Sequence, residues 1–162
     1  MVQELDSALR HFADCARAAS GRDVATLAGA GAAGGLGAGM MFFTPARLKP
    51  GVAIVLDAVG FAELVKDAAF VITGEGRTDF QTAYGKAPVG VARVAKQFGV
   101  PVFCISGGLG DGADDVLAQG IDAIMSICKR PLTLEECMQD AAALIEEAAT
   151  RLCRIIKVRI EL

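Results

Sequence analysis

The hydrophobic positions in the first part of the chain recur at helical spacing. Residues 4–19 place Leu5 and Leu9 on one stripe and charged side chains outside it, which predicts an amphipathic helix. A second helical pattern runs from 52 to 66 and is interrupted at Gly60. The first part of the chain is therefore expected to be helical.

From residue 69 the pattern changes to short apolar segments that alternate with amphipathic ones. Strands are predicted at 69–73, 101–106 and 121–126, and helices at 87–98, 113–119 and 133 to about 155. Strands and helices in strict succession favour right-handed crossovers and a parallel sheet covered on both faces. The fold class predicted for this part is α/β.

The last predicted helix carries the clearest local signal. Thr133 followed by Glu136 spells a capping box, and acidic residues come early in the helix while basic ones come late. The tail 156–162 alternates apolar and charged residues, so it is either a terminal edge strand or a fraying end.

Composition indicates a folded domain. The chain has 162 residues, of which 53% are hydrophobic and only 6% aromatic, so its apolar content rests on small aliphatic side chains. That content is high for so short a chain. It predicts either a tightly packed α/β structure of small residues or a piece whose natural neighbour is missing.

Charge and cysteine usage exclude several classes of function. The net charge of −3 and the lack of a basic cluster with aromatics argue against a nucleic-acid partner. The chain shows no long uninterrupted apolar run and no basic leader, so membrane insertion and secretion are not expected. Its five cysteines contain no CxxC pair, which predicts reduced, buried thiols in a cytoplasmic protein.

The glycine-rich segment 29–39 allows three interpretations. Gly29, Gly31 and Gly34 match the spelling of the dinucleotide-binding fingerprint, but the strand before them is short and Asp57 lies inside a helical pattern. An anion-binding loop that presents backbone amides fits better. The third interpretation is a helix packed unusually close to its neighbours.

A second glycine-rich segment, 106–112, follows a predicted strand and precedes a predicted helix. In parallel α/β sheets ligands bind beyond the carboxyl ends of the strands, where a glycine turn exposes amides to phosphate. The segment lacks the Walker lysine and hydroxyl pair, so it is not a usual P-loop. An ordinary tight turn is the alternative.

The segment 74–86 carries the most chemistry, and we expect it to form a loop. Glu75 and Asp79 suit Mg²⁺ or the activation of a substrate hydroxyl, while Arg77 and Lys86 suit phosphate charge. Hydroxyl and amide groups suited to ligand oxygens stand at Thr78, Gln81 and Thr82. The plainer alternative is a solvated surface turn with incidental ion pairs.

Several of these segments together resemble the bacterial two-domain glycerate kinases. The resemblance rests on the segments 29–37, 50–60, 71–79, 81–82 and 85–92, in this order and with similar spacing. It implies ATP-dependent phosphorylation of D-glycerate with Mg²⁺. It also implies a flavodoxin-like, Rossmann-like three-layer domain built from both ends of the chain, with a second domain inserted between them.

The resemblance covers only the C-terminal part of such proteins. It implies that 1–50 is a helical, Gly/Ala-rich segment from the end of the inserted domain and that 51–162 is part of the flavodoxin-like domain. The expected catalytic residues are Glu75, Arg77, Asp79 and Lys86, with Glu75 and Asp79 also on the metal. The expected cofactor-binding residues are Gly29, Gly31, Gly34, Gly35, Gly74, Gly76, Gly107 and Gly108.

The N-terminal blocks of such kinases are absent from this sequence. A doubly wound sheet without its neighbouring strands leaves apolar edges unpaired, so we expect self-association or pairing with the missing N-terminal half. The alternative function is a non-catalytic remnant that binds anions or nucleotides.

Overall fold

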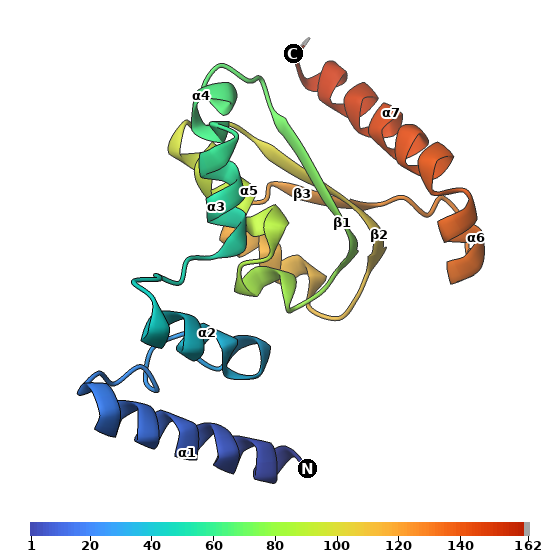
Figure 1. Cartoon of the computed structure of the whole chain (residues 1–162). Helices are drawn as coiled ribbons and strands as arrows, with labels where there is room; N and C mark the ends of the chain where they lie inside the picture. Colours follow the sequence, from blue (N-terminus) through green and yellow to red (C-terminus); the bar gives the residue numbers. More distant parts are fainter. Residues whose placement is uncertain (161–162) are drawn as a thin grey trace. The chain divides into compact units, whose positions relative to one another are not determined.

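The structure, a computed structural model, describes residues 1–160 and separates into two compact units (Figure 1). The first unit comprises Met1–Lys49, and the second begins at Pro50. Each unit is described here by itself.

The first unit consists of helices α1 (Val2–Ser20) and α2 (Ala32–Phe43). Gly21 ends α1 in the left-handed conformation, and its N–H donates to the Arg17 carbonyl at 2.8 Å. Before its regular part, α2 opens with a left-handed turn over residues 33–35. A small core forms inside this unit from Val24, Ala30, Ala38 and Met41.

The second unit is an α/β layer structure. In chain order its elements are α3 (Gly51–Ala58), α4 (Phe61–Val65), β1 (Val71–Thr78), η1 (Thr82–Tyr84), α5 (Ala87–Gln97), β2 (Val102–Leu109), η2 (Ala113–Gln119), β3 (Ala123–Ser126), α6 (Leu134–Gln139) and α7 (Ala141–Ile160). The three strands form a parallel sheet in the order β1-β2-β3. The predicted fold class and parallel sheet are therefore confirmed.

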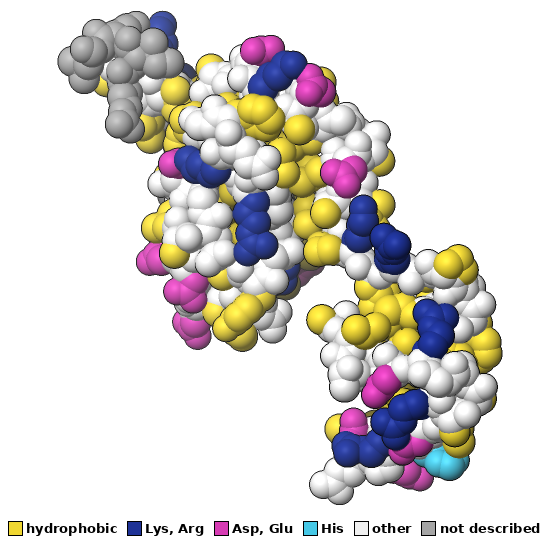
Figure 2. All heavy atoms as spheres, turned by 90° about the vertical axis from the view of Figure 1, so that its left-hand side faces the viewer, with side chains coloured by type: hydrophobic (Ala, Val, Ile, Leu, Met, Phe, Trp, Pro, Cys, Tyr) yellow, Lys and Arg dark blue, Asp and Glu magenta, His cyan; other side chains and the backbone are white. Residues whose placement is uncertain are grey.

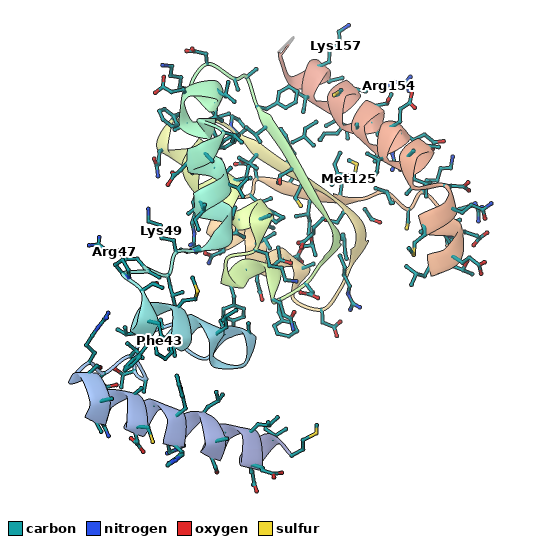
Figure 3. All side chains as sticks on the ribbon, viewed as in Figure 1. Phe43, Arg47, Lys49, Met125, Arg154 and Lys157 are labelled. Atoms are coloured by element: carbon teal, nitrogen blue, oxygen red, sulfur yellow. The ribbon has the colours of Figure 1, made fainter. Side chains whose placement is uncertain are left out.

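The two faces of the sheet carry different cores. On one face, buried side chains from α4, α5, β2, η2 and the segments that lead into β2 and β3 form the larger cluster: Val65, Val89, Ala92, Ala95, Val100, Val102, Cys104, Val116 and Ile121. On the other face α7 packs through Leu144, Ala148 and Leu152 onto Ile105 and Ile127. Met125 on β3 points toward α7, whereas Arg154 and Lys157 project from the outer side of that helix (Figure 3).

Both long strands extend farther than the sequence predicted. β1 continues through Thr78 and β2 through Leu109, because the two pair in register up to their last residues, Thr78 opposite Leu109. The expected loop at 74–86 is thus strand as far as 78, and the expected turn at 106–112 is strand as far as 109. Parallel pairing accounts for this, since glycine does not prevent a strand whose neighbour supplies its hydrogen bonds.

The predicted final helix is divided in two at Asp140. The capping box is confirmed, with the Glu136 N–H donating to Thr133 Oγ1 at 3.2 Å and the Thr133 N–H donating to Glu136 Oε2 at 2.7 Å. Of the two alternatives predicted for 156–162, the edge strand is wrong for 156–160, which continue α7. Residues 161 and 162 lie outside the described residues.

Charged side chains of both signs are spread over the surface. His11, the one histidine of the sequence, is exposed on α1, and basic and acidic side chains are interspersed on the face shown in Figure 2. Within residues 1–160 no helix combines the length and the apolar character that a bilayer crossing requires.

Candidate functional site

The carboxyl ends of β1 and β2 lie side by side and form one rim of the sheet. Arg77 is opposite Gly108 in the parallel register. The segments that follow β1 and β2 stay hydrogen-bonded to each other. The Gly110 N–H donates to the Thr78 carbonyl at 2.8 Å, and the Phe80 N–H donates to the Asp111 carbonyl at 2.9 Å. Ligands of parallel α/β sheets bind at this kind of rim.

Three charged side chains meet at this rim, and we call them the charged cluster: Arg77, Asp79 and Lys86. Lys86 Nζ lies 3.6 Å from Asp79 Oδ1, and Arg77 Nε lies 3.9 Å from Asp79 Oδ2. The carboxylate is held in place at 18% exposure, whereas Arg77 is 69% exposed and free to reorient. The cluster thus offers one fixed anion and two adjustable cations, a set suited to phosphate or carboxylate ligands.

The backbone explains why Asp79 is fixed. Its Oδ1 accepts the Gln81 N–H at 3.0 Å, and its own N–H donates to Thr82 Oγ1 at 3.2 Å. This arrangement is an Asx turn, in which a short carboxylate side chain stabilises the bend that follows a strand. Lys86 then caps α5, whose first turn includes Pro88.

Thr78 and Thr82 are buried, so the expectation that their hydroxyls bind ligand oxygens is wrong. Thr82 Oγ1 serves Asp79, as described above. Thr78 Oγ1 lies 2.6 Å from Ser106 Oγ and donates to Glu75 Oε1 at 3.0 Å, so Ser106 must supply the proton between the two hydroxyls. These threonines position the carboxylates of the rim from inside the core.

Glu75 on β1 and Asp79 just beyond its end carry carboxylates, the ligand type that Mg²⁺ takes in proteins. Among the described residues no group of three or more histidine, cysteine or acidic side chains could hold a metal by itself. Mg²⁺ does not need such a cage, because it commonly binds through one or two carboxylates together with waters and substrate phosphates. Glu75 and Asp79 would hold the ion there, and it would neutralise phosphate charge.

A groove of about 930 Å³ opens beside the rim, on the face of β1 that α7 leaves uncovered. Glu75 and Arg77 form its polar end, and the four expected cofactor-binding glycines of the strands, Gly74, Gly76, Gly107 and Gly108, line its floor. Its remaining walls are apolar and come mainly from Ile72, Ile105, Ile127, Leu134, Cys137, Met138, Ala141, Ile145 and Ala149. An apolar hollow with a few convergent polar groups is the usual form of a ligand site.

Glycine stands at these four strand positions for different structural reasons. A Cβ on Gly107 would collide with the Gly76 carbonyl, and one on Gly74 with the Ile105 carbonyl, so these two allow the strands to approach. A Cβ on Gly76 or Gly108 would meet nothing within 4 Å. Packing therefore accounts for the first pair, and only the second pair leaves bare backbone open to a ligand.

The glycines predicted in 29–35 belong to the first unit and divide in the same way. A Cβ on Gly35 would approach Leu9 Cδ2 at 2.6 Å, and one on Gly29 would approach Leu48 Cδ1 at 3.0 Å. Open space surrounds the Cβ positions of Gly31 and Gly34. Positive φ angles of 88°, 66° and 89° account for Gly29, Gly34 and Gly35, so Gly31 is the one of these four that packing and backbone conformation leave to the anion-loop interpretation.

Sequence reasoning missed two features of the site. Gly110 makes room for Arg77, whose guanidinium nitrogens would lie 2.7 Å from a Cβ there. The groove walls on α6 and α7 were also missed, although the exposed apolar residues Leu134 and Met138 stand one turn apart in the sequence and could have indicated them.

Comparisons with known proteins agree on one family. The sequence profile described as the glycerate kinase family matches residues 1–157. The chain is 55% identical over 148 residues to a glycerate kinase of Halalkalibacterium halodurans, covering 91% of this chain and 39% of that protein. It is 45% identical over 141 residues to glycerate 2-kinase of Escherichia coli K12, covering 87% of this chain and 37% of that protein.

A solved structure gives the same result. The chain superposes on a protein assigned as glycerate kinase 2 of Salmonella typhimurium LT2 with a TM-score of 0.73 and 37% sequence identity. The match covers 100% of this chain and 41% of the other. The chain thus spans about two fifths of the length of the relatives it matches.

Proposed function

Because this chain belongs to the glycerate kinase family, we propose that it carries part of the site at which ATP phosphorylates D-glycerate. Relatives that are named glycerate kinase support the assignment of this chain to an enzyme that transfers a phosphoryl group to an alcohol. The supporting observation in the structure is the charged cluster at the carboxyl ends of β1 and β2, where Lys86 and Arg77 flank Asp79.

We assign the following roles. Lys86 and Arg77 neutralise the charge of the transferring phosphoryl group, since catalysis of this reaction consists mainly of positioning and electrostatic stabilisation. Asp79 and Glu75 hold Mg²⁺ or accept the proton of the glycerate hydroxyl. The backbone at Gly76 and Gly108, where there is space for a ligand in place of a side chain, contacts phosphate oxygens, and Gly74 and Gly107 keep the two strands close together.

The first unit has a separate place in this proposal. We assign residues 1–50 to the end of the family's inserted domain and residues 51–162 to the flavodoxin-like domain. We also propose that the protein acts in the cytoplasm, as its charge and cysteine usage suggest.

The decisive experiment replaces the carboxylate of the cluster in a full-length relative, at the position aligned with Asp79. An asparagine keeps an oxygen that accepts the Gln81 N–H, so Asp79→Asn preserves the turn and removes only the charge. We expect kcat/KM for ATP-dependent phosphorylation of D-glycerate to fall by about 100-fold or more.

The matched control is Asp67→Asn, an exposed aspartate that precedes β1 at the opposite end of the strand. It should leave kcat/KM close to that of the unmodified enzyme. Near-normal turnover of Asp79→Asn with an intact thermal transition would reject the catalytic role of Asp79.

A second part of the proposal concerns partners. β1 is an edge of the sheet, and the groove beside it exposes Ile72, Leu134, Met138 and Ile145. Exposed edges and apolar patches promote association. We infer that this chain associates through this face, either with a second copy or with the part of a family member's chain that lies outside it.

Two lysine substitutions on one helix test this inference. Ile145 lines the groove and is 50% exposed, whereas Ile155, also on α7, is 62% exposed and does not line it. Sedimentation velocity should show association of the unmodified chain that Ile145→Lys weakens by about tenfold and Ile155→Lys leaves unchanged. A chain that stays monomeric at every concentration contradicts the inference.

The alternative function is an anion- or nucleotide-binding module without turnover. The charged cluster suits an anionic ligand whether or not a reaction follows binding. Turnover assays on this chain with ATP and D-glycerate, run in parallel with nucleotide binding by calorimetry, separate the two. Binding without turnover supports the module.

A further inference from the structure

Two thiols lie in contact at the edge of the groove. Cys128 follows β3, Cys137 lies on α6, and their sulfur atoms are 3.5 Å apart. The sulfurs need to approach by about 1.5 Å to reach the length of an S–S bond, a change within the reach of side-chain rotation.

The backbone around both cysteines is fixed by hydrogen bonds, so their proximity is built into the fold. The Cys128 N–H donates to Ser126 Oγ at 3.1 Å, and the Cys128 thiol donates to the Gly107 carbonyl on β2 at 3.5 Å. The capping box of Thr133 and Glu136 fixes the first turn of α6 and with it the position of Cys137.

Solvent exposure distinguishes Cys128 and Cys137 from the other three cysteines. The prediction that all five thiols are buried is wrong, because Cys15 and Cys153 are exposed and only Cys104 is fully buried. Cys128 and Cys137 are half-buried, and Cys137 lines the open groove. The hydrogen bond shared with Cys128, burial and nearby negative charge raise the pKa of Cys137, so Cys137 rests as a thiol at neutral pH.

We propose that Cys128 and Cys137 form a reversible intramolecular disulfide when the chain meets a small disulfide oxidant such as oxidised glutathione. One of the two cysteines loses its proton to solvent, and its thiolate attacks a sulfur of the oxidant and expels one glutathione thiolate. The second cysteine then attacks the mixed disulfide and expels the other half. Two protein thiols are oxidised, and one small disulfide is reduced to two thiols.

The bond links α6 to the end of β3 and, through Cys128, to the strand that carries Gly107. Because Leu134, Cys137 and Met138 of α6 form one wall of the groove, oxidation fixes that wall. Amide exchange in α6 should slow in the oxidised chain and recover on reduction. This inference does not rest on the proposed function, since it needs no substrate and no turnover.

The experiment incubates the purified 162-residue chain with oxidised glutathione, blocks free thiols and digests it with trypsin without reduction. Trypsin cleaves after Lys129 but not before Pro131, so Cys128 and Cys137 fall in the separate peptides 97–129 and 130–151. We expect these peptides to appear cross-linked, with the loss of two of the five titratable thiols.

Peptide 97–129 also contains Cys104, which makes Cys104→Ala the matched control. The cross-link should persist in Cys104→Ala and disappear in Cys128→Ser and in Cys137→Ser. Five unreacted thiols in the unmodified chain, glutathione adducts without a cross-link, or a bond between two chains through Cys15 or Cys153 would each overturn the proposal. The measurement on the unmodified chain stands even where a variant folds poorly.

Discussion

The two faces of the three-stranded sheet are covered to different degrees. On the face toward α5, Val89, Ala92 and Val102 are fully buried, whereas on the face toward α7 the side chain of Ile72 on β1 is 41% exposed. Parallel sheets are stable when both faces are covered. The comparison indicates that the closed face contributes most of the buried core of this unit, whereas the other face leaves apolar side chains of β1 exposed.

The strongest test of this comparison removes one large side chain from each face. Ile121→Ala should lower the free energy of unfolding by about 2–5 kcal/mol, because Ile121 is 2% exposed in the larger core. Met138→Ala should change it by less than about 0.5 kcal/mol, because Met138 is 71% exposed in the groove wall. Urea denaturation measures both, and equal losses would remove the distinction between the faces.

A second test uses the glycine floor of the groove. Gly107→Ala should lower the free energy of unfolding by about 1–3 kcal/mol, since the new methyl group collides with the Gly76 carbonyl and separates β1 from β2. Gly108→Ala is the control, with nothing within 4 Å of its Cβ position and an expected change below about 0.5 kcal/mol. A tolerated Gly107→Ala would mean that this glycine serves something other than strand packing.

The smallest expected effect is a loss of folding stability at low pH. Burial raises the pKa of Asp122 on the closed face, but hydrogen bonds from Lys96 and the Val102 N–H outweigh it and lower that pKa. On the open side, the hydrogen bond from the Thr133 N–H lowers the pKa of Glu136. The stability that each carboxylate contributes is therefore fully present above its unfolded-state pKa. It is lost as the pH falls through the lowered folded-state pKa.

The two carboxylates should differ in what their loss affects. Asp122→Asn should remove at most about 1 kcal/mol of acid-sensitive global stability, because the pair with Lys96 is partly exposed. Glu136→Gln should weaken only α6, which amide exchange reports. A global acid dependence that survives Asp122→Asn unchanged would exclude Asp122 as its source.

Hydrophobic patterning predicted the order of elements well but their ends poorly. The alternation after residue 69 correctly indicated a parallel α/β sheet, since a strand and a helix differ in the spacing of their apolar residues. It placed the end of the first strand at Thr73, because glycine and charge interrupt the apolar run there. The register with β2 carries the strand on to Thr78, and a partner strand is invisible to local patterning.

The candidate site was also predictable only in part from the sequence. Residue type alone selected Glu75, Arg77, Asp79 and Lys86, because carboxylates and basic groups crowded after a strand are the groups that bind phosphate and Mg²⁺. Tertiary structure decided that Asp79 lies between two cations. It also decided that Thr78 turns inward to Ser106, 28 positions away in sequence.

The sequence by itself determined the family, the parallel sheet and the chemistry available at its rim, since these follow from local spacing and residue type. Only the tertiary structure decided which face of β1 is left open, which glycines pack and which stay bare, and that Cys128 meets Cys137. The physical reason is that burial and contact between distant residues depend on the summed packing of all the elements, which no single segment encodes.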